Sequence, residues 1–167
     1  MKDMESYKEA LSKLDFSNVP FEDLPVEVGE KVNEIILKFY EFRDEIINAL
    51  PENIQIVYLV GEFESAILND GLLYVFCNND LKEVLRFRNA IEQTNSKKLL
   101  KLFDDAKSLV EKKYTLKPDT NFTEEYPDDD FEEFVGEKVS DKVEAIAEKI
   151  DDLQGDGEYW NRIANLF

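Results

Sequence analysis

The amino-acid sequence predicts an all-α fold, a single-domain bundle of roughly six or seven helices that ends in a long acidic helix. Three observations support this prediction. Apolar residues recur at spacings of three and four along most of the 167 residues, which is the period of a helix with one buried face. Prolines and an Asn-Asp-Gly triplet separate these segments. Hydrophobic residues make up 43% of the chain and include 12 Phe, which is enough to form a core despite a net charge of −18.

The N-terminal part is predicted to contain two helices joined by a turn-rich connector. Residues 3–14 carry apolar side chains on one face, which is typical of an amphipathic helix. Residues 17–25 include two prolines and are expected to form the connector. A long helix is predicted from 26 to 50, because its apolar residues repeat at spacings of three and four until Pro51 stops it.

The segment 52–69 has two interpretations. β-Branched and aromatic residues alternate between positions 54 and 60, which is typical of a strand. The apolar residues nevertheless keep helical spacing as far as Leu68, which is beyond the usual length of a strand. We therefore prefer a helix and keep the strand as the alternative. The triplet that ends at Gly71 can stop a helix or form a hairpin turn.

Three shorter elements are predicted to follow. The apolar run 72–76 is interpreted as a buried helical turn. Asn78 or Asn79 is expected to cap a helix over 80–93. Ser96 is expected to cap a helix over 97–113, whose apolar residues share one face.

The composition changes near position 118. Residues 1–118, the predicted helical core, hold 16 basic and 22 acidic side chains. Residues 119–158 hold 3 basic and 16 acidic side chains, a net charge of −13, and form the predicted acidic part. This part comprises a loop over 115–130 and the last long helix over 131–152, before the terminal segment 159–167. Because charge that serves only solubility would be spread more evenly, the concentration indicates an interaction surface.

The predicted acidic helix has two faces of opposite character. Apolar residues lie on one face with three lysines at its edge, and acidic residues lie on the other. The acidic residues stand about 5.7 Å apart along the axis, which is roughly 60% of the charge density of one DNA strand. Such a face can also be merely solvated. The residues predicted to bind a partner are Glu124, Glu125, Asp128, Asp129, Asp130, Glu133, Glu137, Asp141, Glu144, Glu148 and Asp152.

The composition excludes several kinds of chemistry. The chain has no histidine, which excludes a Ser-His-Asp triad, a Cys-His nucleophile and a histidine metal site. Its single cysteine, Cys77, excludes an intrachain disulfide and a Cys/His zinc site. We therefore predict no catalytic residue, no metal and no cofactor.

Charge and hydropathy also limit the partners. A net charge of −18 would repel phosphates, so neither nucleic acid nor an anionic membrane is expected to bind, and a basic protein is the favoured partner. No apolar run approaches 18 residues and no signal peptide is visible, which predicts a cytoplasmic protein. A basic patch allows pairing with the acidic part of the same copy or of a second copy, as a homodimer, although ordinary helix-surface charge is the preferred interpretation. This patch consists of Arg86, Arg88, Lys97, Lys98 and Lys101.

Positions 69 to 78 read Asn-Asp-Gly-Leu-Leu-Tyr-Val-Phe-Cys-Asn. This run resembles the signature Asn-Gly-Gly-Phe-x-Gln-Phe-Phe-x-Asn of the DNA-mimic protein 19 family of bacterial proteins, with matches at Asn69, Gly71, Phe76 and Asn78. The resemblance extends over roughly residues 58–160 and includes the closing aromatic pair Tyr159-Trp160. It implies an all-α fold and an acidic surface that occupies the DNA-binding face of another protein. By their own chemistry, the four matching residues are predicted to be structural.

These observations lead to three functional hypotheses. The leading one is a non-enzymatic acidic protein that occupies the basic surface of a nucleic-acid-binding protein, such as a transcription regulator. The first alternative is an immunity or antitoxin-like inhibitor of a cationic toxin. The second is an enzyme that uses paired carboxylates, for which the candidates are Glu62 with Glu64 and Asp104 with Asp105.

Overall fold

The computed structural model describes residues 2–167, with side chains from Glu5 onward, and residues 2–167 contain eleven α-helices, one 3-10 helix and no strand. The all-α prediction is confirmed, whereas the predicted number of helices is too low because two expected helices are divided and short helices were missed. The elements are α1 (Lys2–Ser12), α2 (Leu24–Lys38), η1 (Tyr40–Phe42), α3 (Arg43–Ala49), α4 (Glu52–Asp70), α5 (Leu72–Asn78), α6 (Leu81–Gln93), α7 (Lys97–Glu111), α8 (Phe122–Glu125), α9 (Phe131–Val135), α10 (Glu137–Gly155) and α11 (Glu158–Ala164).

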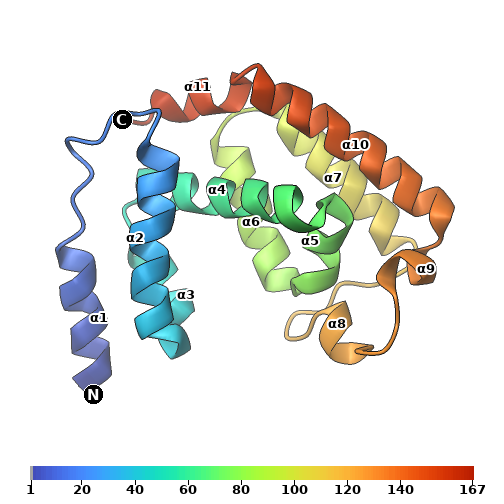
Figure 1. Cartoon of the computed structure of the whole chain (residues 1–167), viewed down its shortest axis with the longest axis horizontal. Coiled ribbons are helices and arrows are strands. Elements are labelled where there is room, and N and C mark those ends of the chain that lie inside the picture. The colour runs from blue at the N-terminus through green and yellow to red at the C-terminus, as the bar shows by residue number, and fades with distance from the viewer. Residues whose placement is uncertain (1) are drawn as a thin grey trace.

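Helix α4 runs across the middle of the molecule, with α1, α2 and α3 on one side and α5 to α10 on the other (Figure 1). It packs against α2, α5 and α6. Residues 56–60 are buried on every face of the helix. This burial removes the polar face that would have revealed a helical period, and it explains why the sequence also allowed a strand here.

The helix predicted over 26–50 is divided after Lys38. Phe39 has φ −133° and ψ 47°, outside the helical region, and a 3-10 turn follows before α3 begins. The residues 39–42 include three aromatic side chains, which lose rotamer freedom in a helix. The turn also lets the ring of Phe42 pack on Tyr7, with the ring centroids 5.3 Å apart.

The acidic helix predicted over 131–152 is also divided, at Gly136. This residue has φ 85° and ψ 146°, a conformation that L side chains rarely adopt, and it separates α9 from α10. The acidic helix is not the last one either. Gly157, with φ 65°, turns the chain into α11, which buries Tyr159 and Ile163.

The helix caps confirm one prediction and correct two others. Ser96 accepts a hydrogen bond from the Leu99 amide and caps α7, as predicted. Helix α6 is capped by Asp80, and not by either asparagine before it. The predicted loop 115–130 contains α8, whose N-terminus is a capping box of Asn121 and Glu124.

Two groups of aromatic rings hold the helices together. Phe103 lies at the centre of the first group, with its ring centroid 5.4 Å from that of Phe63 and 5.6 Å from that of Phe76. In the second group, Phe122 packs against Phe131 at 4.6 Å. Tyr114, just after α7, contacts both of those rings. This aromatic group therefore packs the acidic part against the end of α7.

Within residues 2–167, no helix combines the length and the apolar character needed to cross a bilayer.

Replacing Gly136 by alanine is expected to lower the free energy of unfolding by about 1–3 kcal/mol. No atom lies within 4 Å of the position that the new Cβ would occupy, so the cost arises from the backbone conformation alone. Gly29, inside α2, also has open space around it and serves as the control. Gly29→Ala should raise stability by about 0.5–1 kcal/mol, because alanine is the better helix former. Chemical denaturation measures the free energy of unfolding of both variants. Equal changes in the two variants would contradict the assignment of backbone strain to Gly136.

Candidate partner-binding surface

The acidic residues of α10 are positioned by its apolar face. Val143, Ile146, Ile150 and Leu153 are buried, and the helix packs along α7 and against α5. Figure 1 shows α10 on the outside of the molecule, over α7. Since an α-helix places residues three and four apart on one side, the carboxylates between these apolar positions point away from the core.

Ten of the eleven predicted binding residues are exposed, and Glu125 is half-buried. Within the part of the chain that the structure describes, Glu125 is also the one member of this set in an ion pair, with Lys117. We call the nine exposed residues from 128 onward the acidic surface, which consists of Asp128, Asp129, Asp130, Glu133, Glu137, Asp141, Glu144, Glu148 and Asp152.

Charges on α10 are arranged differently from those on the other long helices. In α2 and α7, oppositely charged residues four apart form ion pairs, such as Lys31 with Glu27 at 3.2 Å and Lys107 with Glu111 at 2.7 Å. In α10, every charged pair at this spacing has the same sign. These pairs are Glu137 with Asp141, Lys138 with Lys142, Glu144 with Glu148, and Glu148 with Asp152. Like charges four apart destabilise a helix. The two oppositely charged pairs three apart, Lys138 with Asp141 and Lys149 with Asp152, are not among the ion pairs of the described residues, so α10 keeps its carboxylates unpaired at a cost in stability.

The predicted basic patch does not neutralise the acidic surface. Arg88 pairs with Asp104 at 2.8 Å, and Lys98 pairs with Glu158 at 3.2 Å. Lys101 also pairs within its own helix, α7. None of the ion pairs between described residues joins this patch to a carboxylate of the acidic surface.

The segment before α9 contributes fewer carboxylates to partner binding than predicted, because two of them have structural partners. Glu124 completes the capping box of α8 and accepts a hydrogen bond from the Thr120 hydroxyl at 3.1 Å. The pKa of Glu125 is lowered, chiefly by its hydrogen bond with Lys117. Asp130 belongs to the acidic surface and also caps α9 through the Glu133 amide.

Two exposed carboxylates between Asp128 and Asp152 were missed by the sequence analysis. Asp151 lies seven residues after Glu144, so the helical spacing could have found it. Glu132 lies in α9 and accepts a hydrogen bond from the Ser140 hydroxyl at 3.0 Å. That contact depends on the turn at Gly136, which the sequence analysis did not predict.

The family-motif residues have structural partners. The side chain of Phe76 is fully buried in the first aromatic group. Gly71 has φ 89° and separates α4 from α5, as its predicted helix-stop role requires. Asn78 accepts a hydrogen bond from the Thr123 hydroxyl at 3.0 Å, and its carbonyl accepts one from Asn121, so this residue joins α5 to α8.

The closing aromatic pair also has a structural role. The Tyr159 hydroxyl and the Trp160 indole N–H both donate to the same oxygen of Glu64, the indole at 2.8 Å. These bonds attach α11 to α4. Burial raises the pKa of Glu64, although the two hydrogen bonds act to lower it.

Replacing Glu64 by glutamine is expected to raise the free energy of unfolding at pH 7 slightly, by up to about 1 kcal/mol. The amide oxygen can accept both hydrogen bonds without burying a charge. Because the folded protein binds the Glu64 proton more tightly than the unfolded chain does, the contribution of Glu64 falls as pH rises from about 4.5 through the raised pKa. The variant should lack this fall.

Thermal unfolding between pH 4 and pH 8 tests this expectation. Glu41→Gln, at an exposed position, serves as the control and should behave like the unaltered protein. A Glu64→Gln protein that is less stable than the unaltered protein across this range would show that the charge strengthens the two hydrogen bonds more than burial penalises it.

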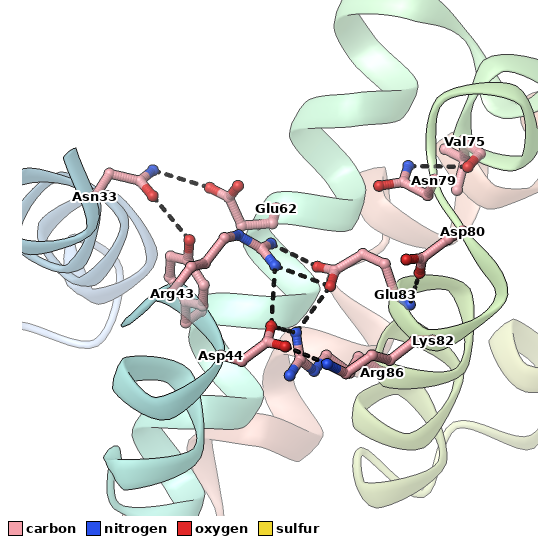
Figure 2. Close-up of polar contacts among 11 residues, drawn as sticks. Asn33, Arg43, Asp44, Glu62, Val75, Asn79, Asp80, Lys82, Glu83 and Arg86 are labelled. Atoms are coloured by element: carbon pink, nitrogen blue, oxygen red, sulfur yellow. Dashed lines mark hydrogen bonds and ion pairs between the residues drawn. The ribbon is translucent and has the colours of Figure 1, made fainter. Parts of the chain in front are cut away.

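A second charged cluster joins α3 to α6 (Figure 2). Arg43 donates two hydrogen bonds to the Glu83 carboxylate, at 2.9 and 2.6 Å, and Arg86 contacts both Glu83 and Asp44. Burial alone would raise the pKa of Glu83, but Arg43 and then Arg86 lower it. The hydrogen bond from Arg86 lowers the pKa of Asp44 to about 2, and Lys82 adds to this shift. Both carboxylates are ion-paired with basic side chains of the cluster, so the cluster acts as a structural link.

The paired carboxylates suggested as catalytic candidates also form hydrogen bonds or ion pairs within the protein. Glu62 accepts a hydrogen bond from Asn33 at 3.0 Å, and Glu64 holds the two aromatic donors. Asp104 and Asp105 are both in ion pairs. Among the side chains that the structure describes, from Glu5 onward, no group of three or more carboxylates or thiols is arranged to hold a metal ion.

Comparison with known proteins agrees with the predicted resemblance. A sequence model of the family described as DMP19-like protein matches residues 48–166, which include the acidic surface and helices α4 to α11. The resemblance inferred from the motif is therefore confirmed. A search of curated proteins and a search of solved structures give no match.

Proposed function

Because the chain belongs to the DMP19-like protein family, we propose that it is a non-enzymatic binding protein whose acidic surface occupies the basic surface of a nucleic-acid-binding protein, such as a transcription regulator. The observation that carries the proposal is the row of exposed carboxylates on α10 with no ion pair among the described residues. Their negative charge is available to a partner with the opposite charge.

The spacing of this row suits the imitation of a phosphate backbone. From Glu137 to Asp152 the carboxylates extend over about 22 Å, at a rise of about 1.5 Å per residue. This length corresponds to roughly six or seven base pairs at about 3.4 Å each. The aspartates at 128–130 and Glu133 add four exposed carboxylates on the loop and the short helix that precede the row. A protein that binds DNA through lysines and arginines would meet a row of negative charges at roughly 60% of the density of one DNA strand.

The stability cost of the arrangement supports the same proposal. A helix that needed charge only for solubility could alternate its signs and gain about 0.2–0.5 kcal/mol from each pair four residues apart. Helix α10 carries like-signed pairs at this spacing, and its lysines form no ion pair among the described residues. An arrangement that lowers stability is expected where the unpaired charge is used in binding.

Competition with DNA tests the proposal. The immobilised protein is incubated with extract of its native host at about 50 mM salt, and each retained protein is purified. Double-stranded DNA added to the purified complex should release the retained protein, because the two ligands would share one basic surface. A retained protein that binds DNA and this chain simultaneously would contradict the proposal. A retained protein with no affinity for DNA would instead favour the toxin-inhibitor alternative.

A further inference from the structure

A groove with a volume of about 500 Å³ lies between α10 and the segment that joins α4 to α5. Its apolar part includes Leu68, Tyr74 and Ala147. Leu68 is 68% exposed and belongs to this apolar lining. A ligand that covered Leu68 would therefore gain from its burial.

Carboxylates line the same groove from three helices. Asp70 belongs to α4, Glu132 to α9, and Glu144, Glu148 and Asp151 to α10. No lysine or arginine is among the described residues that line it. The groove therefore combines apolar lining residues with negative charge that no basic side chain compensates within it.

The groove continues beyond Asp70 and Tyr74. These two residues also line a second depression of about 560 Å³, which extends to Asp129 and Asp130. The groove therefore connects the middle of α10 to the start of the acidic surface.

We infer that this groove binds an amphipathic helical segment of the basic partner, with leucine-like side chains on Leu68 and Tyr74 and with arginines or lysines facing the surrounding carboxylates. The inference rests on the proposed function and adds the chemistry of the bound segment. An uncharged apolar segment would remove water from several carboxylates without replacing it. A purely cationic segment would leave Leu68 uncovered. An arginine that reached the ring of Tyr74 could also stack on it.

Two synthetic peptides of identical composition test this inference. The first places leucines and arginines at helical spacing so that they form two faces, and the second has the same residues in scrambled order. Binding of each fluorescent peptide to the unaltered protein is measured by anisotropy at low salt and at about 300 mM salt. The amphipathic peptide should bind about tenfold more tightly than the scrambled one, and the difference should persist at high salt because apolar contact is not screened.

The substitution Leu68→Asp separates apolar contact from charge. It adds a negative charge, so attraction by charge alone would leave the affinity for the amphipathic peptide unchanged or raise it. The groove predicts about tenfold weaker binding, since the buried contact is lost. Leu37→Asp, at a position on α2 that is 79% exposed and outside the groove, adds the same charge and should not weaken binding. Both positions are exposed, and unfolding curves check that both variants fold.

Equal binding of the two peptides, or a Leu68→Asp protein that binds the amphipathic peptide as tightly as the unaltered protein, would overturn the inference. Either result would leave the proposed function standing if both peptides still lost affinity at high salt. The proposed function itself would fail if neither peptide responded to salt. The two failures are therefore distinguishable.

Discussion

Neutralising four carboxylates of α10 is expected to weaken binding to the basic partner at least about fivefold at low salt. Each exposed charge pair contributes about 0.2–1 kcal/mol, so four lost pairs remove about 1–4 kcal/mol of binding free energy. The acidic-surface variant carries Glu137→Gln, Asp141→Asn, Glu144→Gln and Glu148→Gln. Its dissociation constant is measured with the protein recovered from the host extract.

A matched control separates local charge from net charge. The control variant changes four exposed glutamates from the other side of the molecule, none of which is in an ion pair among the described residues. Both variants carry a net charge of −18 + 4 = −14, so a general effect of charge would weaken both equally. The control should bind within about twofold of the unaltered protein. It carries Glu22→Gln, Glu30→Gln, Glu41→Gln and Glu45→Gln.

The acidic-surface variant should also be more stable than the unaltered protein. It relieves three like-signed acidic pairs on α10, each of which costs about 0.2–0.5 kcal/mol, so the free energy of unfolding should rise by about 0.5–1.5 kcal/mol at low salt. Chemical denaturation measures this change. A variant that lost both binding and stability would indicate a damaged fold, and its binding result would then carry no information about the surface.

Removing the carboxylate of Glu83 is expected to have the largest effect on stability outside the apolar core. Glu83 is only 8% exposed and is the shared acceptor for Arg43 and Arg86. Glu83→Ala leaves two partly buried guanidinium groups without this acceptor, which should lower the free energy of unfolding by about 3 kcal/mol. Urea denaturation at pH 7 measures the loss.

An exposed pair in the same helix provides the control for Glu83. Glu92 contacts Arg88 at 3.4 Å, and its side chain is largely in solvent. Glu92→Ala should cost less than about 0.5 kcal/mol. Because the folded-state pKa of Glu83 is lowered, its contribution is present above the pKa of the unfolded chain and is lost as pH falls through the folded value. The difference in free energy of unfolding between Glu83→Ala and the unaltered protein should therefore shrink in acid. A difference that grew in acid would contradict this expectation.

The parts of the fold that depend on local sequence could be predicted. Helix α7 is an example, since Ser96 caps it and its apolar residues from Leu99 to Val110 all face the core. The exposed position of the acidic residues on α10 followed from the same helical spacing. In both helices polar and apolar residues recur with the period of a helix. The local sequence alone therefore predicts which face of each helix is buried.

Other features depend on contacts between residues far apart in the sequence. Arg43 and Glu83 are 40 residues apart, and nothing near either residue indicates the other. The ends of α2 and α9 depend on backbone conformations at Phe39 and Gly136 that continuous apolar spacing conceals. The groove beside α10 requires α4, α5 and α10 to be placed together, so it could not be recognised before the fold was known.

The salt dependence of partner binding tests the central claim most directly, namely that the carboxylates of α10 are the part of the molecule that holds the basic partner. The dissociation constant is measured between about 50 and 300 mM salt for the unaltered protein, the acidic-surface variant and the matched control. We predict a steep loss of affinity with salt for the unaltered protein and the control, and a much flatter response for the acidic-surface variant. The same steep response in all three proteins would contradict the claim.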